Sequence, residues 1–242
     1  MLKVFAFLLF AVCGLAQAEQ PLLRDLPLAY VAQASTEVKG KPLVIFLHGY
    51  GGDETNLLSF TSLMPDDYNY LAVRAPMNAR QEGYQWFTPR RDSAYYDGVT
   101  SDLKSSGQLL EQFIEQATRK YQTQPSKVFL VGFSQGAMMS YEVALRHPQL
   151  VGGFAALSGH MLSVLKAELK PDPARQKLAI FIGHGTADSL IPVQGASDAE
   201  AYLKAQGLKP QYHAYAGLPH GVNEAEVKDL VGWLERTVKS AR

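Results

Sequence analysis

One serine of this chain stands where a nucleophile elbow would place it. The stretch Gly132-Phe133-Ser134-Gln135-Gly136 directly follows the apolar run 128–131 and directly precedes a helix-forming stretch, 137–145. A strand, a tight turn and a helix in this order hold the central serine in a strained backbone conformation, which requires very small neighbours such as glycine. We therefore interpret Ser134 as a catalytic nucleophile rather than as part of a plain glycine-rich turn.

Two downstream residues supply what a serine nucleophile needs. Asp188 lies on a loop just after the strand-like run 178–182, and His220 lies on a loop bounded by glycine and proline after a second strand, 211–215. A serine hydroxyl is a weak nucleophile near neutral pH, so His220 would accept its proton while Asp188 holds the imidazole in the productive tautomer. The chain order Ser, Asp, His is that of α/β-hydrolases. These three residues are our predicted catalytic triad.

An upstream loop predicts the oxyanion hole. The apolar run 43–47 ends in His48-Gly49-Tyr50-Gly51-Gly52, and α/β-hydrolases present one oxyanion-binding amide from a small-residue loop at this place. The second amide comes from the residue after the nucleophile, so we assign the backbone N–H groups of Tyr50 and Gln135. The alternative of a phosphate-binding loop is disfavoured, because the Gly-Lys-Ser/Thr of a P-loop and the spacing of a dinucleotide fingerprint are missing.

Strands and helices alternate along the chain and predict what positions these residues. The clearest helix, 99–121, carries an apolar stripe at helical spacing, and the last helix begins with a predicted capping box, Asn223-Glu224-Ala225-Glu226. The strand candidates are residues 29–33, 43–47, 70–74, 127–131, 153–157, 179–182 and 211–215. This alternation predicts an α/β-hydrolase fold, with a mostly parallel central sheet and helices on both faces.

The first residues are typical of a secretory signal peptide. Lys3 precedes the apolar run 4–15, and Ala16-Gln17-Ala18 then supplies an A-x-A cleavage site. The apolar run is shorter than the roughly 20 residues of a membrane span, which disfavours a permanent anchor. We therefore expect residues 1–18 to be removed, residues 19–242 to form a single domain, and the protein to be exported to the periplasm or the medium. Cys13, the one cysteine, would leave with the leader.

Composition excludes several function classes. A chain of 242 residues with 47% hydrophobic side chains can bury one sizeable core. Its 23 basic and 23 acidic side chains balance, so no global field would recruit nucleic acid or an anionic membrane surface. The histidines lack the spacing of a zinc set, and we expect neither a metal nor an organic cofactor. Oligomeric state is not predicted.

The combined motifs resemble those of the phospholipase/carboxylesterase family, which includes the acyl-protein thioesterases. The motifs that carry the resemblance are His48-Gly49-Tyr50-Gly51-Gly52-Asp53, Ala75-Pro76, Gln85-Trp86-Phe87, the serine pentapeptide, His184-Gly185-Thr186-Ala187-Asp188 and Pro219-His220-Gly221. The resemblance covers essentially the whole chain after the leader. It implies a small metal-free α/β-hydrolase that acts on short acyl esters, lysophospholipids or thioesters. Tyr84 departs from the basic residue expected in many bacterial relatives, and this leaves acyl and head-group preference open.

These observations predict a serine carboxylesterase that cleaves small esters with short to medium acyl chains through an acyl-enzyme on Ser134. A lysophospholipase or acyl thioesterase is the alternative, and a serine peptidase or a non-catalytic hydrolase-like binding protein is less favoured. Trp86 and Phe87 are assigned to the substrate pocket, although packing within a loop would explain the same residue types.

Overall fold

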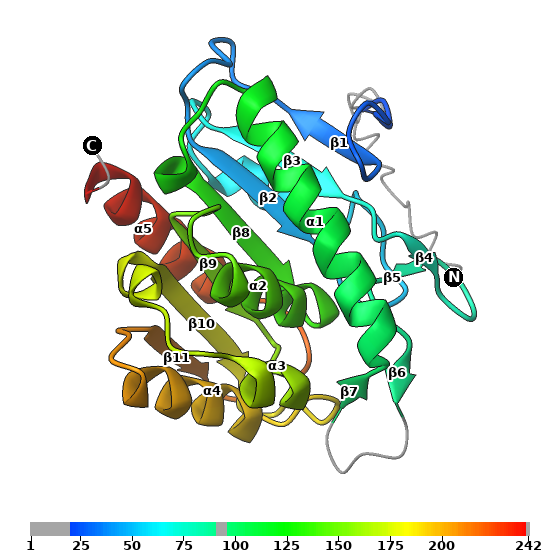
Figure 1. Cartoon of the computed structure of the whole chain (residues 1–242), viewed down its shortest axis with the longest axis vertical. Helices are drawn as coiled ribbons and strands as arrows, with labels where there is room; N and C mark the ends of the chain where they lie inside the picture. Colours follow the sequence, from blue (N-terminus) through cyan, green and yellow to red (C-terminus); the bar gives the residue numbers. More distant parts are fainter. Residues whose placement is uncertain (1–19, 91–95, 241–242) are drawn as a thin grey trace, which may run out of the picture.

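The central sheet brings the predicted functional loops to one edge. The computed structural model describes residues 20–90 and 96–240, so the predicted leader lies outside the described residues. Seven strands stand in the order β1-β3-β2-β8-β9-β10-β11, and every neighbouring pair is parallel except β1 with β3 (Figure 1). Parallel strands end at the same edge, so the segments that follow β2, β8, β10 and β11 meet there. The predicted mostly parallel sheet is confirmed.

The strands of the main sheet are β1 (Tyr30–Gln33), β2 (Leu43–Leu47), β3 (Asn69–Val73), β8 (Val128–Phe133), β9 (Gly153–Leu157), β10 (Ala179–Gly185) and β11 (Gln211–Tyr215). Two small hairpins between β3 and the first long helix pair β4 (Met77–Asn78) with β5 (Tyr84–Gln85), and β6 (Pro89–Arg90) with β7 (Asp97–Gly98). The helices are α1 (Thr100–Lys120), α2 (Gln135–Arg146), α3 (Ser163–Glu168), α4 (Gln194–Ala205) and α5 (Glu224–Ser240), with short 3-10 turns η1 (Leu58–Leu63), η2 (Pro125–Lys127) and η3 (Pro173–Lys177).

Apolar side chains fill two layers, one on each face of the sheet. The larger cluster joins the sheet to α1, α2 and α4, for example through Leu110, Met138 and Leu203. The smaller cluster joins the other face to α5 through Leu230 and Trp233. Figure 1 shows α1 and α2 in front of the sheet and α5 behind it. Both faces are therefore covered, because a parallel sheet is apolar on both sides and must bury each of them.

Two strands run further than the sequence predicts. β8 reaches Phe133, and β10 reaches Gly185 instead of ending at 182. In β10 the extension pairs Gly185 with Tyr215 of β11, and in β8 it pairs Phe133 with Leu157 of β9. Glycine has low strand propensity, so the local pattern undervalues these positions, whereas hydrogen bonding to neighbouring strands keeps them in the sheet. Ser134 therefore follows β8 directly, and Asp188 lies three residues beyond the end of β10.

The predicted capping box at the start of α5 is only half formed. The Asn223 side chain accepts a hydrogen bond from the Glu226 N–H at 2.9 Å. The Glu226 carboxyl does not accept a bond from the Asn223 N–H, because it is fully buried against the sheet. It lies so close to Gly183 that a Cβ added there would be 2.2 Å from Glu226 Oε1. Neither oxygen has a hydrogen-bond partner among the described residues. Burial, with a smaller contribution from Asp229, raises the pKa of Glu226 to about 8, so the carboxyl stays protonated at neutral pH.

This raised pKa predicts that the free energy of unfolding falls as the pH rises from about 4.5 to about 8. The folded state holds its proton more tightly than the unfolded state, so the stabilisation is complete below about pH 4.5 and is lost as the pH rises through about 8. Glu226→Gln should remove this dependence and raise the free energy of unfolding near pH 9, relative to the parent, by roughly 3 to 5 kcal/mol. Urea unfolding at several pH values measures it. The exposed neighbour Glu224→Gln is the matched control, and a pH-independent difference between Glu226→Gln and parent would contradict the argument.

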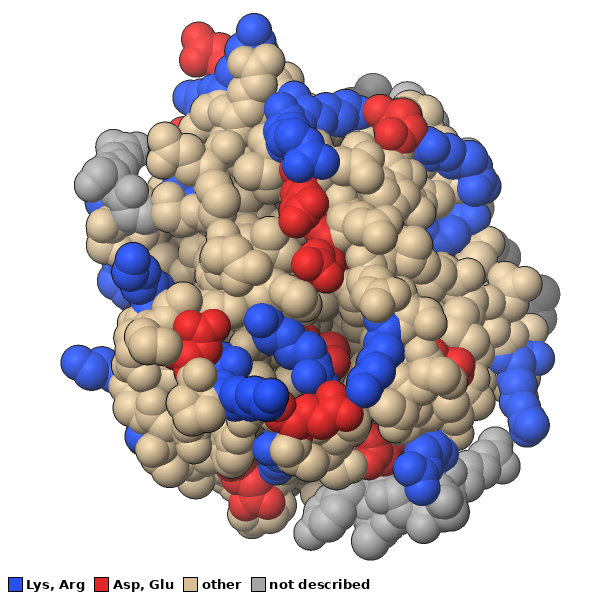
Figure 2. All heavy atoms as spheres, in the orientation of Figure 1, with Lys and Arg blue, Asp and Glu red and all other residues tan. Residues whose placement is uncertain are grey.

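Charges of both signs are mixed on the face of the molecule that Figure 2 shows. Figure 2 shows Lys or Arg beside Asp or Glu on the face that carries α1 and α2, without a large area of one sign. Ion pairs such as Lys104 with Glu168 and Lys120 with Asp25 account for part of this mixture. Within residues 20–90 and 96–240, no helix is long and apolar enough to cross a membrane.

Candidate active site

Ser134 occupies a strained turn between β8 and α2. Its backbone has φ 54° and ψ −116°, a conformation that residues other than glycine rarely adopt. The two glycines of the pentapeptide allow the close packing of this turn. A Cβ on Gly132 would lie 2.2 Å from the Gly136 carbonyl oxygen, and a Cβ on Gly136 would lie 1.9 Å from that of Leu47. The turn therefore has the geometry of a nucleophile elbow.

The structure brings the three predicted triad residues into one hydrogen-bonded chain. His220 Nε2 lies 3.1 Å from Ser134 Oγ, and His220 Nδ1 lies 2.7 Å from Asp188 Oδ2. With the Nδ1 proton donated to the carboxylate, Nε2 is free to accept the serine proton. This arrangement can therefore generate a serine nucleophile at neutral pH.

The Asp188 carboxylate is held from two further sides. Its Oδ1 accepts backbone hydrogen bonds from Leu190 at 2.9 Å and from Ile191 at 2.8 Å. On its other side, His184 Nε2 lies 3.3 Å from Asp188 Oδ2 and 2.8 Å from the Ile191 carbonyl oxygen, so the Nε2–H donates there. Burial lowers the pKa of His184, which keeps this imidazole neutral. These contacts fix the carboxylate that orients His220.

The two predicted oxyanion donors flank Ser134. Gln135 is the first residue of α2, and an N–H at that position has no acceptor within the helix. Gly49, which precedes Tyr50, packs on the nucleophile so closely that a Cβ added to it would lie 3.2 Å from Ser134 Cβ. In the described part of the chain, Tyr50 N–H donates to no protein acceptor, whereas Gly51 N–H donates to the Tyr84 carbonyl at 2.9 Å. Both amides are thus available to a developing oxyanion.

His48 fixes the loop that carries Tyr50. Its Nδ1–H donates to the Gly49 carbonyl at 2.6 Å, and its Nε2 accepts the Ala75 N–H at 3.1 Å. The backbone carbonyl of His48 accepts a hydrogen bond from Trp86 Nε1 at 2.8 Å. Burial lowers the pKa of His48, which favours the neutral ring that these bonds require. His48, which the sequence marks only as part of a motif, therefore holds the loop that carries Tyr50 in place.

The predicted pocket role of Trp86 and Phe87 is corrected by their burial. Both side chains have 0% exposed surface and belong to the core beneath the site. The Gln135 side chain ties this segment to the elbow, since its Oε1 accepts the Trp86 N–H at 3.0 Å and its Nε2 donates to the Phe87 carbonyl and to Tyr96 Oη, both at 2.9 Å. Aromatic residues in a loop are typical of substrate contacts, but here the segment packs so that both side chains are buried.

These contacts predict a stability role for the Gln135 side chain. Gln135→Met keeps the backbone N–H and nearly the same volume but removes an acceptor and a donor from buried partners. We expect the free energy of unfolding to fall by roughly 2 to 4 kcal/mol, because the Trp86 N–H and the Phe87 carbonyl lose their partners. Urea denaturation measures the change, and Tyr96→Phe, which removes one of these bonds, should cost only about 1 kcal/mol. A Met variant as stable as the parent would exclude this bridging role.

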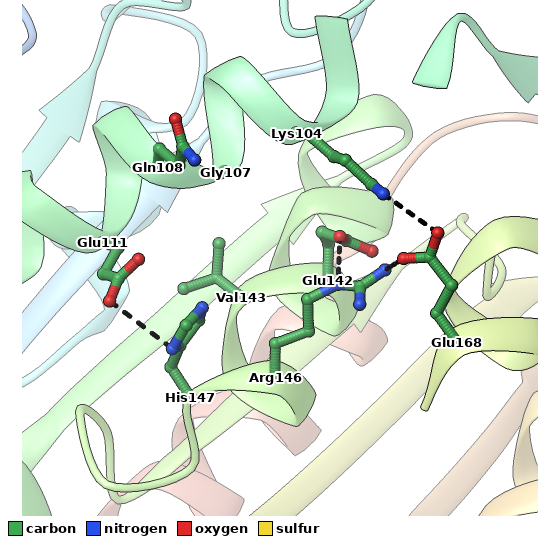
Figure 3. A pocket seen from close by; sticks show the side chains of 9 residues that line it. All are labelled: Lys104, Gly107, Gln108, Glu111, Glu142, Val143, Arg146, His147 and Glu168. Carbon is green, nitrogen blue, oxygen red and sulfur yellow. Dashed lines mark hydrogen bonds and ion pairs between the residues drawn. The ribbon is translucent and has the colours of Figure 1, made fainter. Parts of the chain in front are cut away.

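A hollow lies away from the triad, between α1 and α2 (Figure 3). It has a volume of about 250 Å³ and is lined by charged side chains. Lys104 Nζ lies 2.9 Å from Glu168 Oε1, Arg146 Nη2 lies 3.0 Å from Glu168 Oε2, and Arg146 also bonds Glu142. Glu142 is eight residues beyond Ser134, about 12 Å along a helix that rises 1.5 Å per residue. The pairs link α1, α2 and α3 and lie outside the catalytic geometry.

Among the described residues, no group of three His, Cys, Asp or Glu side chains is placed to hold a metal ion. The chemistry that the site itself provides is acid–base and nucleophilic.

The fold is that of an α/β-hydrolase, and the site contains a hydrogen-bonded chain of serine, histidine and aspartate. Residues 29–238 match the model of the family described as Phospholipase/Carboxylesterase, and the chain belongs to that family. Acyl-protein thioesterase 1 of Debaryomyces hansenii is 27% identical over 226 residues, which cover 86% of this chain and 97% of that protein. Carboxylesterase SOBER1 of Arabidopsis thaliana is 26% identical over 216 residues, 83% and 92% of the two chains. The crystal structure of esterase PE8 aligns with a TM-score of 0.74 at 25% identity and covers 85% of this chain and 97% of that one.

Proposed function

We propose that this protein hydrolyses carboxylic esters of short to medium acyl chains through an acyl-enzyme on Ser134. The observation that carries the proposal is the hydrogen-bonded chain from Ser134 through His220 to Asp188 at a strained elbow. Membership of a family that contains carboxylesterases supports the proposal. The alignments with the two relatives named above cover nearly the whole length of each relative.

The geometry yields a complete acyl-transfer sequence. His220 Nε2 takes the proton from Ser134 Oγ as the oxygen attacks the ester carbonyl, and the amides of Tyr50 and Gln135 hold the resulting oxyanion. The intermediate collapses when the leaving oxygen takes the proton from His220. Water, activated by the same histidine, then releases the acid and restores the serine. Asp188 keeps the imidazole in the required tautomer throughout.

A fluorophosphonate probe tests the nucleophile directly. The probe reacts covalently with an activated serine, so mass spectrometry of the labelled protein should place the adduct on Ser134. The Ser134→Ala variant should take up no label under the same conditions. Absence of label on the folded parent protein, together with no turnover of 4-nitrophenyl butyrate, would exclude the serine hydrolase proposal.

Thioester hydrolysis is a second candidate, favoured by the similarity to an acyl-protein thioesterase. The same serine, histidine and oxyanion amides serve a thioester, because the tetrahedral intermediate differs only in its leaving atom. A comparison of kcat/KM for an oxygen ester and a thioester of the same acyl chain decides between the two activities.

We also propose that the protein acts after export. The support is the sequence alone: a basic start, an apolar run and Ala16-Gln17-Ala18. The expected exported form begins at Glu19, which intact-mass measurement of the protein recovered from the periplasm or medium would reveal. An exported form that retains Met1 would contradict cleavage at this site.

A further inference from the structure

A small hollow adjoins the catalytic serine on a side where the sequence indicates no pocket. Its volume is about 310 Å³, and its wall comes from the oxyanion loop, the turn η1, the end of β8 and the histidine loop. The side chains that form the wall are Tyr50, Asn56, Leu57, Phe60, Phe133 and Val222. They differ from the buried Trp86 and Phe87 pair, so this hollow has no role assigned so far.

Residues that line the hollow are direct neighbours of Ser134 and His220. Its floor includes Gly49, where an added Cβ would lie 3.2 Å from Ser134 Cβ and 3.2 Å from Phe133 Cδ1. The Phe133 ring centroid is 5.0 Å from that of the His220 ring, and Val222 follows His220 by two residues. The hollow thus shares its wall residues Gly49 and Phe133 with the immediate surroundings of the serine and the histidine.

The wall of the hollow is preorganised. Asn56 Oδ1 accepts the Asp53 N–H at 2.9 Å, and a Cβ on Gly52 would lie 2.1 Å from the same oxygen, so Asn56 packs on the oxyanion loop. The Phe60 ring packs edge-on against Phe46 with centroids 6.4 Å apart. A wall held by these contacts is already formed before a ligand binds. It can therefore discriminate between ligand groups by their size.

We propose that this hollow binds the alcohol part of the ester and selects small, uncharged alcohols. The inference rests on the proposed function. When the tetrahedral intermediate collapses, the bond between the acyl carbon and the leaving oxygen breaks, and its electron pair stays on that oxygen, which takes the proton from His220 Nε2. The leaving oxygen must therefore face His220, and the group attached to it extends into the hollow on the same side.

Charge and size define the class of alcohol. The described side chains that line the hollow are uncharged, so a phosphate or ammonium group placed there would lose its hydration without gaining an ion-pair partner. The volume is at the lower end of the roughly 300 to 1,000 Å³ typical of ligand pockets. A short aliphatic or benzylic alcohol fits both conditions, whereas the zwitterionic head of a lysophospholipid fits neither.

The test separates the two ends of the substrate by comparing three esters. Benzyl acetate against ethyl acetate changes only the alcohol, and ethyl hexanoate against ethyl acetate changes only the acyl chain. The measured quantities are the two ratios of kcat/KM within each variant. Because each ratio is taken within one protein, a general loss of triad activity cancels.

Val222→Phe narrows the hollow and should lower the benzyl-to-ethyl ratio by about tenfold, while the hexanoate-to-acetate ratio stays within about twofold of the parent. Phe60→Ala widens the hollow and should raise kcat/KM for a fourth ester with a bulkier alcohol, naphthylmethyl acetate, relative to that for benzyl acetate. The control is Leu63→Ala, which lies on the same turn η1 but is 54% exposed and outside the hollow, so both ratios should be unchanged.

A change in the hexanoate ratio with a constant benzyl ratio would overturn the proposal, because the hollow would then hold the acyl chain. Constant ratios in both folded variants would exclude the hollow from substrate binding. Lysophosphatidylcholine turned over as well as benzyl acetate would contradict the charge argument. Failure of the parent protein to hydrolyse any ester, with no fluorophosphonate label on Ser134, is a different result that would overturn the proposed function itself.

Discussion

Ser134→Ala should lower kcat for ester hydrolysis by a factor on the order of 10⁴ to 10⁶ and leave the fold intact. The hydroxyl supplies the covalent step, and alanine cannot form the acyl-enzyme whatever the remaining residues do. The backbone is expected to tolerate the change, because alanine has the same Cβ as serine and the Ser134 N–H keeps its 2.9 Å bond to the Leu157 carbonyl. Steady-state kinetics with 4-nitrophenyl butyrate and circular dichroism measure the two effects.

A matched control comes from a second buried serine, which lies in the helix that follows Ser134. Ser140 is fully buried in α2, and its Oγ donates to the Gly136 carbonyl at 3.0 Å, away from His220. Ser140→Ala should therefore retain activity within about threefold, since it loses one internal hydrogen bond and no catalytic group. Activity of Ser134→Ala within tenfold of the parent would show that another residue is the nucleophile.

Asp188→Asn should reduce kcat by about 10³ to 10⁴, less than the loss of the serine itself. Asparagine fits the same space and can keep the backbone bonds from Leu190 and Ile191 to its oxygen. Its amide nitrogen then faces His220 Nδ1 and donates to it, which forces the imidazole proton onto Nε2. In that tautomer His220 cannot accept the proton of Ser134, so the nucleophile is not activated.

Asp198→Asn is the control for this variant. Asp198 is the next acidic residue along the chain, but it is exposed on α4 and accepts a bond from Gln194 at 2.7 Å. Kinetics on the same ester should show an effect of less than about threefold, because a surface carboxylate outside the site contributes little. Nearly full activity of Asp188→Asn with a large loss in Asp198→Asn would reassign the triad acid.

The triad could be predicted from the sequence because each member follows a strand. In a parallel sheet the strand ends converge, so apolar runs followed by Ser134, Asp188 and His220 place all three at one edge without knowledge of the packing. The oxyanion loop after Leu47 follows the same rule. Local pattern and chain order therefore determine the fold class, the family resemblance and the elbow, which the strand order and the backbone of Ser134 bear out.

Other assignments depended on contacts between distant segments. The sequence marks Trp86 and Phe87 as aromatic loop residues, but a bond from Gln135, 49 positions from Trp86, decides that they face inward. Glu226 has the spacing of a capping box, yet the absence of a side chain at Gly183 lets its carboxyl enter the space under the sheet. Gln135 and Gly183 both lie far along the chain from the residues they affect, so a local sequence pattern does not include them.

The tertiary structure decided most for the surface that we propose binds substrate. The hollow beside Ser134 is assembled from the oxyanion loop, η1, β8 and the segment after His220, and none of these segments carries a pattern that distinguishes a pocket wall from core. The sequence alone predicted the cluster of Ser134, Asp188 and His220 and the parallel sheet, because strand ends and glycine turns are local features. Only the folded chain determined which side chains line the hollow that we propose binds substrate, because that depends on which loops pack together and which of their faces remain exposed.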